Sequence, residues 1–234
     1  MPDHILDNPV WNALTSGNSN LAMGNDHAKF FPEDIGPFAG LQEWREELFQ
    51  QLYQMIPAKR LVAVFSNQHL NIPPYWKIKE TVKALQMIFT NTIHPINIEA
   101  NIIPLEKQHV PQMIALTKLT HPGPFSQRTI EFGNYNGIFN SEKLIAMAGE
   151  RMHANEYVEV SAVCTHPDHT GKGYGKLLVN NQVHKIVTEG NIPFLHVRAD
   201  NEHATNLYKH LGFTARSEMN INIIQKESGS VSGT

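Results

Sequence analysis

The residues best placed to bind a charged ligand form a glycine-rich stretch, TGKGYG, at 170–175. An extended, β-branched run at 159–165 precedes it, and an amphipathic run with helical spacing follows it as far as Val187. The order of strand, glycine loop and helix directs several backbone N–H groups and the positive end of a helix at one point, which suits a phosphate or pyrophosphate. Glycines also serve tight turns, so the loop alone is equally compatible with a structural role.

Spacing disfavours two common nucleotide-binding loops. The stretch does not have the form GxxxxGK[ST], and the GxGxxG register fails because Lys176 stands where the third glycine would be. Both a P-loop and a dinucleotide-binding loop are therefore weak interpretations of this segment.

A second segment, residues 196–213, reads HVRADNEHATNLYKHLGF. It predicts a strand followed by a helix with one apolar side, and Gly212 is expected to cap the C-terminal end of that helix. Taken without the glycine loop, the simplest interpretation is an amphipathic helix whose Tyr208 fills the core.

The elements that must position these segments begin near Ile98. In order, the spacing predicts a strand, a helix at 107–119, strands at 136–153 and 157–165, the glycine loop, a helix, a strand, a helix and a strand. This order indicates an α/β (α+β) fold with mostly antiparallel strands and one βαβ step.

Residues 1–95 are expected to form an N-terminal α/β extension of unknown role, and residues 96–234 the domain that carries the motifs. Along the extension we expect irregular structure to residue 40, a helix at 41–55, a buried strand at 61–66, a second amphipathic run at 78–89, and a turn-rich boundary at TNTIHP. The apolar helix face of Trp44, Leu48 and Leu52 is expected to dock the extension on the other domain.

Composition limits the classes of function. A net charge of -3 and a pI near 6.5 give no general attraction to nucleic acid or an anionic membrane. The single cysteine, Cys164, excludes an intramolecular disulfide, and the thirteen histidines show no HExxH spacing, so we expect no metal. The sequence has no signal-like or membrane-spanning apolar run, and we expect a cytoplasmic protein.

The two segments together resemble the GNAT (GCN5-related) superfamily of N-acetyltransferases, whose loop has the form [R/Q]xxGxG and whose later motif is NxxAxxLYxxLGF. The later motif is matched by Asn201, Ala204, Leu207, Tyr208, Leu211, Gly212 and Phe213. The segment GIFNSEKLIAMAGERM is similar to the superfamily's central hairpin. One departure is Thr170 at the usual Arg or Gln position, for which Lys172 is a candidate source of compensating charge.

The resemblance implies a GNAT fold, a central mixed and mostly antiparallel sheet flanked by helices, and acetyl-CoA as co-substrate. It implies cofactor contacts from Val163, Cys164, Thr165, Thr170, Gly171, Lys172, Gly173, Tyr174, Gly175, Asn201 and Tyr208. The N-terminal extension offers an analogy with the glycine N-acyltransferase-like branch.

By the same resemblance, Glu159 is the first candidate for the general base and Tyr208 for the acid that protonates the CoA thiolate. Glu150 and His153 are rival bases, and a water chain is a further alternative. The resemblance also implies that backbone groups of Val163, Cys164 and Thr165 line the pantetheine arm of the cofactor and that one of their N–H groups holds the thioester oxygen. Cys164, a small thiol in a β-branched strand, is expected to be packed rather than nucleophilic.

The acceptor is expected to be a small-molecule or peptide amine, bound near His121, Phe125 and Glu150. The expected function is therefore transfer of an acetyl or other acyl group from acetyl-CoA to the nitrogen of a primary amine. We expect the protein to be a monomer or a homodimer. The alternatives are an amino-acid or longer-chain N-acyltransferase and a catalytically silent acyl-CoA-binding module.

Overall fold

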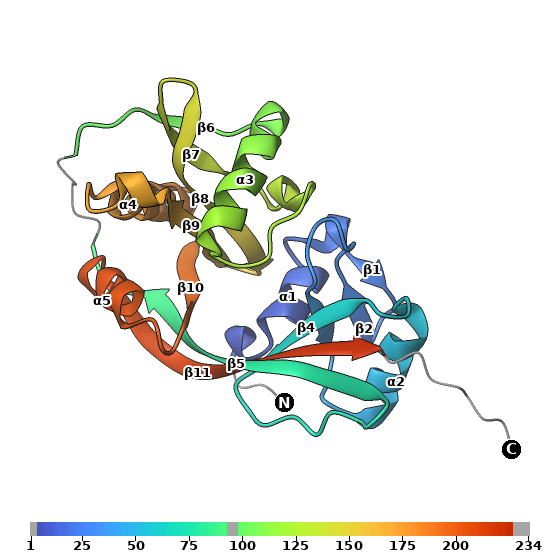
Figure 1. Cartoon of the computed structure of the whole chain (residues 1–234). Helices are drawn as coiled ribbons and strands as arrows, with labels where there is room; N and C mark the ends of the chain where they lie inside the picture. Colours follow the sequence, from blue (N-terminus) through green and yellow to red (C-terminus); the bar gives the residue numbers. More distant parts are fainter. Residues whose placement is uncertain (1–3, 93–97, 227–234) are drawn as a thin grey trace, which may run out of the picture.

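The computed structural model describes residues 4–92 and 98–226. Its centre is an eight-stranded sheet in the order β4-β11-β5-β10-β9-β8-β7-β6, and a three-stranded sheet, β1-β2-β3, lies in the N-terminal region (Figure 1). The strands are β1 (Met23–Gly24), β2 (Ala28–Phe30), β3 (Ala39–Leu41), β4 (Leu61–Ser66), β5 (Trp76–Phe89), β6 (Ile102–Pro104), β7 (Asn136–Asn140), β8 (Lys143–Ala154), β9 (Tyr157–Thr165), β10 (Ile192–Arg198) and β11 (Phe213–Lys226). The helices are α1 (Pro9–Thr15), α2 (Glu46–Met55), α3 (Val110–Thr120), α4 (Tyr174–Thr188) and α5 (Glu202–His210).

The C-terminal order of elements confirms the sequence prediction. In the large sheet, β9 and β10 pair in parallel and α4 connects them, whereas the other neighbouring strands pair antiparallel. The expected α+β architecture, with a mixed and mostly antiparallel sheet and one βαβ step, is therefore present.

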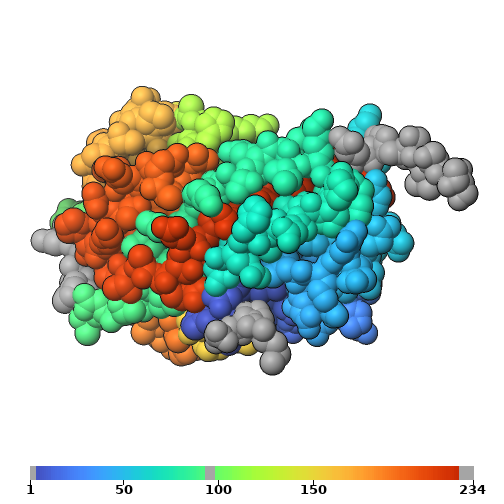
Figure 2. Space-filling model, turned by 90° about the horizontal axis from the view of Figure 1, so that it is seen from below, coloured from blue at the N-terminus to red at the C-terminus, as the bar shows by residue number. Residues whose placement is uncertain are grey.

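The amphipathic run at 78–89 is part of a long strand, β5, and not of a helix. The strand lies between β10 and β11 and pairs with both of them. Hydrogen-bonding neighbours on both edges decide the conformation here, because local propensity is a weak guide when tertiary pairing competes with it. Figure 2 shows the teal and green residues of this part of the chain lying against the red C-terminal residues.

The large sheet contains strands from both sides of the expected domain boundary. β4 and β5 come from the extension, and they pair with β11 and β10 from the motif-bearing part. The boundary itself, expected at 95, falls within 93–97 and lies outside the described residues. The extension thus supplies one end of the sheet that carries the motifs.

Two helices cover opposite faces of β8 and β9. On the α3 side, Met113 and Leu116 pack with Leu144 and Cys164. On the α4 side, Leu178 packs with Ile145 and Ala148. Because successive residues of a strand point to opposite faces, the neighbouring positions 144 and 145 fix this arrangement.

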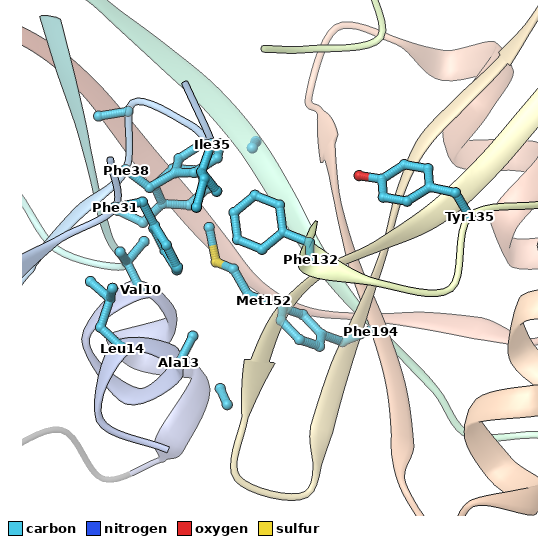
Figure 3. Close-up of a cluster of buried hydrophobic side chains, with 14 of the residues drawn as sticks. Val10, Ala13, Leu14, Phe31, Ile35, Phe38, Phe132, Tyr135, Met152 and Phe194 are labelled. Carbon is cyan, nitrogen blue, oxygen red and sulfur yellow. The ribbon is translucent and has the colours of Figure 1, made fainter. Parts of the chain in front are cut away.

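The first 40 residues are more regular than expected, and they carry the contact with the rest of the fold. Val10, Ala13 and Leu14 of α1 are fully buried and pack in one cluster with Met152 and Phe194 from the large sheet (Figure 3). The predicted docking face of Trp44, Leu48 and Leu52 instead packs mainly on the extension's own strands, in a cluster that reaches Ile224 of β11. The predicted docking route through α2 was therefore wrong, because α1 makes the larger contact.

Candidate functional site

The two parallel strands of the large sheet part midway along their length. β9 and β10 share three residue pairs, the last of which joins Glu159 to Phe194. β9 then continues to Thr165 and β10 to Arg198 without further pairing between them. The facing edges beyond Glu159 therefore present backbone groups that another molecule can use.

A bulge lies on β9 just past this divergence. The register with β8 shifts between the pairs Met147–Cys164 and Gly149–Ser161, which places one extra residue on β9. Ala162 has a φ of 52°, in the left-handed region that non-glycine residues seldom adopt. A bulge interrupts the ladder and turns the strand, so the backbone at Val163 is re-aimed relative to a regular strand.

The glycine loop connects β9 to the N-terminus of α4. Gly171 and Gly173 have φ values of 76° and 79°, which glycine adopts without strain. Gly173 is the N-cap of α4 and provides no side-chain cap, so the first N–H groups of this fifteen-residue helix have no capping side chain. A Cβ on Gly171 would meet no atom within 4 Å, so the backbone is open to close approach at that point.

The side chains of this loop do not converge on one point. The hydroxyl of Thr170 donates to the Pro167 carbonyl at 2.9 Å and so closes the preceding turn. Lys172 is exposed, and Tyr174 is half-buried against Leu178 and Ile138. Any anion at this loop would thus meet mainly backbone N–H groups and the end of α4.

Tyr208 and Val163 come together on the α4 side of the sheet. Both pack in the cluster that contains Val179 and Val183 of α4. Burial raises the pKa of the Tyr208 phenol to about 12, so its proton is retained at neutral pH. Asn201 instead accepts from the Ala204 N–H at 3.0 Å, which is an N-cap of α5.

Glu159 lies at the divergence point with its carboxylate fully engaged. Arg151 donates to it twice, from Nε at 2.7 Å and from Nη2 at 2.6 Å, and His196 Nδ1 lies 2.7 Å from Oε1. Glu159 itself is fully buried. Burial alone would raise the pKa of this carboxyl, but Arg151 and then His196 outweigh it and lower the pKa to about 2.

The hydrogen-bonded chain continues from Glu159 into the N-terminal region. His196 Nε2 lies 3.0 Å from Gln86 Nε2, and that same amide donates to the Leu6 carbonyl at 2.8 Å. Arg216 donates to Gln86 Oε1 and, at 2.6 Å, to Asp7 Oδ1. A largely buried polar network therefore joins β8, β9, β10, β5 and β11 to the turn before α1.

With this geometry in view, comparisons with known proteins decide the family. Residues 135–221 match the family described as FR47-like protein. A solved structure of a GNAT-family protein from Novosphingobium aromaticivorans is 31% identical, with a TM-score of 0.89, and the match covers 97% of this chain and 100% of that one. The chain belongs to the GNAT acetyltransferase family.

Two more distant solved structures share the GNAT fold. A GCN5-related N-acetyltransferase from Kribbella flavida is 13% identical, with a TM-score of 0.60, over 96% of this chain and 97% of that one. A Drosophila protein is 17% identical, with a TM-score of 0.62, over 85% of this chain and 73% of that one. No curated protein matches the chain in sequence. The expected fold is confirmed, and the relation holds for nearly the full length.

Glu150 and His153, the rival bases, lie apart from the Glu159 network of this GNAT protein. Glu150 pairs with Val160, which packs under α4, so its side chain is on the opposite face from Glu159. It accepts from Asn134 Nδ2 at 2.8 Å, and His153 Nε2 lies 3.1 Å from the same oxygen. The structure therefore does not place Glu150 with the other predicted acceptor residues.

The remaining predicted residues divide between the core and the surface. Cys164 is buried on the α3 side, and burial raises the pKa of its thiol to about 11, which favours packing over nucleophilic attack. Phe125 packs edge-on against Tyr135, with ring centroids 5.6 Å apart. His121 is exposed and ends α3 in a left-handed conformation, with a φ of 50°.

Within 4–92 and 98–226, no three His, Cys, Asp or Glu residues come together as a metal site. Over the same ranges, no helix has the length and apolar character needed to cross a membrane.

Sequence reasoning missed Arg151, Gln86 and Arg216, the partners that hold the network together. Arg151 is eight residues from Glu159, and the hairpin that contains both was predicted, so their proximity could have been noticed. Gln86 lies on the strand that was not recognised as one, which hid its pairing with β10.

Proposed function

We propose that this GNAT protein transfers an acetyl or other acyl group from acyl-CoA to a primary amine by direct transfer. One observation carries the proposal, namely that β9 and β10 diverge directly before a glycine loop that opens α4. That arrangement offers strand-edge groups to an extended amide-containing arm and helix N–H groups to a pyrophosphate in the same ligand.

The residues present fit acyl-CoA. The backbone from Gly171 to Gly175 would bind the pyrophosphate, because Gly171 leaves the backbone open and no side chain caps α4. The β9 edge at Val163 and Thr165 would pair with the pantetheine amides. Thr170 and Asn201, whose side chains bond within the protein, would contribute little to affinity.

When bound, acyl-CoA supplies a thioester whose carbonyl carbon bonds to the amine nitrogen while the carbon–sulfur bond breaks. The backbone N–H groups near the Ala162 bulge would stabilise the negative charge that develops on the carbonyl oxygen. Tyr208 would donate a proton or a hydrogen bond to the departing thiolate, since its raised pKa keeps it protonated. The proton released by the amine balances the one that the thiolate finally gains.

The amine proton is better assigned to water than to Glu159. A carboxylate with a pKa of about 2 is a weak proton acceptor, and three donors already occupy its oxygens. Glu159 would instead fix the position of Arg151 and His196 at the divergence point. Of the bases considered from the sequence, namely Glu159, Glu150, His153 and a water chain, the geometry favours the water chain.

The experiment combines binding and turnover on the full chain. Calorimetry should show that CoA and acetyl-CoA bind while ATP does not, because ATP has no arm to pair with the β9 edge. A panel of primary amines should then release one free thiol for each amide found by mass spectrometry. Binding of acetyl-CoA with no thiol release for any amine would support the catalytically silent module, and failure to bind CoA would refute the proposal.

A further inference from the structure

Tyr135 is a buried phenol with an uncommitted hydroxyl on the α3 side of the sheet. Its side chain is part of the core, and the residue is only 3% exposed. Its backbone is held, because the Leu105 N–H donates to the Tyr135 carbonyl at 2.8 Å. Over the described residues, no hydrogen bond involves its hydroxyl, which Figure 3 shows directed toward the side where Phe132 lies.

The ring of Tyr135 is held in place by packing against Gly149 and Phe125. A side chain on Gly149 of β8 would overlap the ring, so glycine at that position lets the phenol lie flat on the sheet. Phe125 packs against the same ring in an edge-to-face arrangement. A firmly placed phenol whose hydroxyl has no partner among residues 4–92 and 98–226 is unusual in a core, where polar groups are normally hydrogen-bonded.

Arg151 provides a second unused donor in the same neighbourhood. Its Nε and Nη2 are committed to Glu159, whereas its Nη1 has no partner within the described parts of the chain. The side chain is 13% exposed, and Glu159 is not exposed at all, so the exposure lies away from the ion pair. The central guanidinium carbon lies over the Phe38 ring, 4.8 Å from its centroid, so this ring covers one approach to the guanidinium.

These two donors lie against one hydrophobic cluster on the α3 side of the sheet. Tyr135 belongs to the cluster that contains Phe38, Phe65 and Cys164, and the Arg151 guanidinium lies over the Phe38 and Phe65 rings. Cys164 is next to Val163 at the β9 bulge, close to where transfer would occur. Burial raises the pKa of Tyr135 above its ordinary value, so the hydroxyl keeps its proton as a donor.

We propose that Tyr135 Oη and Arg151 Nη1 together bind the carboxylate of the acceptor, and that the acceptor is an α-amino acid. A carboxylate accepts from a phenol and from a guanidinium edge at once, and charge-assisted bonds of this kind are stronger than neutral ones. Fixing the carboxylate on the α3 side directs the neighbouring α-amine toward the edge of β9. This inference rests on the proposed acyl transfer and names the substrate class for that same site.

The test compares amino acids with their amides, which differ in the carboxylate alone. Glycine, alanine and phenylalanine are each paired with the corresponding amide, and kcat/KM is measured with saturating acetyl-CoA. The parent should prefer the amino acid by at least about 10-fold, because one hydrogen bond to a charged group contributes about 1.5–3 kcal/mol, which is about 10- to 100-fold. The Tyr135→Phe variant should lose about 10-fold of that preference, chiefly through KM.

The variant should fold normally, because it keeps the ring that packs on Gly149 and Phe125 and removes a hydroxyl that bonds to none of the described residues. Tyr157→Phe is the matched control, since this phenol on β9 bonds to His4 at 3.2 Å, at the opposite end of the strand. The control should keep the parent's preference for amino acids. Affinity for CoA should be unchanged in both variants.

A second readout does not require turnover. Calorimetry should show that N-acetylglycine, N-acetylalanine and N-acetylphenylalanine bind the parent more tightly than their amides, and that Tyr135→Phe removes most of the difference. Equal binding of acids and amides, or a preference that survives Tyr135→Phe, would overturn the inference. Thiol release with amines of every kind, without preference for a carboxylate, would refute the substrate class and leave the proposed transferase function intact.

Discussion

Replacing Glu159 with glutamine separates a positioning role from that of a general base. The substitution keeps the shape of the side chain but removes its charge, and one oxygen becomes an NH₂ group that faces a donor. Arg151 is mostly buried and has Glu159 as its bidentate partner, so the variant leaves a largely buried guanidinium charge without compensation.

The magnitude follows from the pKa of the carboxyl. Folding lowers this pKa from 4.5 to about 2. At about 1.4 kcal/mol per pH unit, the difference corresponds to about 3 kcal/mol of stability. Because the folded pKa is depressed, this contribution is fully present above about pH 4.5 and is lost as the pH falls toward about 2. Breaking a buried ion pair by removing one partner costs about 3–5 kcal/mol, which agrees with this figure.

The assay is chemical and thermal unfolding of the parent and Glu159→Gln, followed by circular dichroism between pH 7 and pH 2.5. At pH 7 we expect the variant to be about 3–5 kcal/mol less stable, with a Tm lower by roughly 6–20 °C. The gap between the two proteins should narrow as the pH falls below about 4.5. Glu156→Gln, in the exposed turn before β9, should change stability by less than about 0.5 kcal/mol.

One outcome would refute this reasoning. If Glu159→Gln were as stable as the parent at pH 7 while acyl transfer fell by about 100-fold or more, Glu159 would act on the substrate amine rather than on Arg151. A stable and active variant would equally contradict the ion pair as a source of stability.

Two further changes test the cofactor site and the acid. The side chains introduced by Gly173→Asp and Gly173→Asn have nearly the same shape at the same left-handed backbone position, and they differ in charge. Calorimetry should give a CoA affinity about 10- to 100-fold weaker for the Asp variant than for the Asn variant, because the carboxylate repels the pyrophosphate. Equal affinities would place the pyrophosphate elsewhere. Tyr208→Phe should slow acyl transfer by roughly 10- to 1000-fold with little change in acyl-CoA affinity, and near-parental turnover at saturating amine would leave Tyr208 a core residue alone.

The sequence was sufficient for the C-terminal fold because local signals and global topology agree there. The β-branched run of β9, the glycines before α4 and the Asn201 cap of α5 each specify their element by local physics. At residues 78–89, by contrast, the local sequence does not specify the element. Its alternation of polar and apolar residues fits two periods, and only its pairing with β10 and β11, distant in sequence, decides between them.

The candidate site was only partly accessible to sequence reasoning. Backbone features follow from glycine positions, so the loop could be found, whereas the state of Glu159 depends on Arg151 and His196, which reach it through strand pairing and a bulge. Spacing reveals that a carboxylate exists but not which donors surround it. For the same reason Tyr135 gave no signal, because the placement of its ring against Gly149 depends on packing and not on local sequence.

Residues of the N-terminal region contact the Arg151–Glu159 pair directly and so form part of the candidate site. Phe38 and Phe65 stack on the guanidinium of Arg151, and Asp7 ends the polar network that starts at Glu159. β10 and β11, which flank the later motif, are joined through β5. Without residues 4–92, β10 and β11 would lose their shared neighbour, and the Arg151–Glu159 pair would lose its aromatic cover and meet water. Since water would weaken that pair, the extension sets the electrostatics of the divergence point that the motifs define.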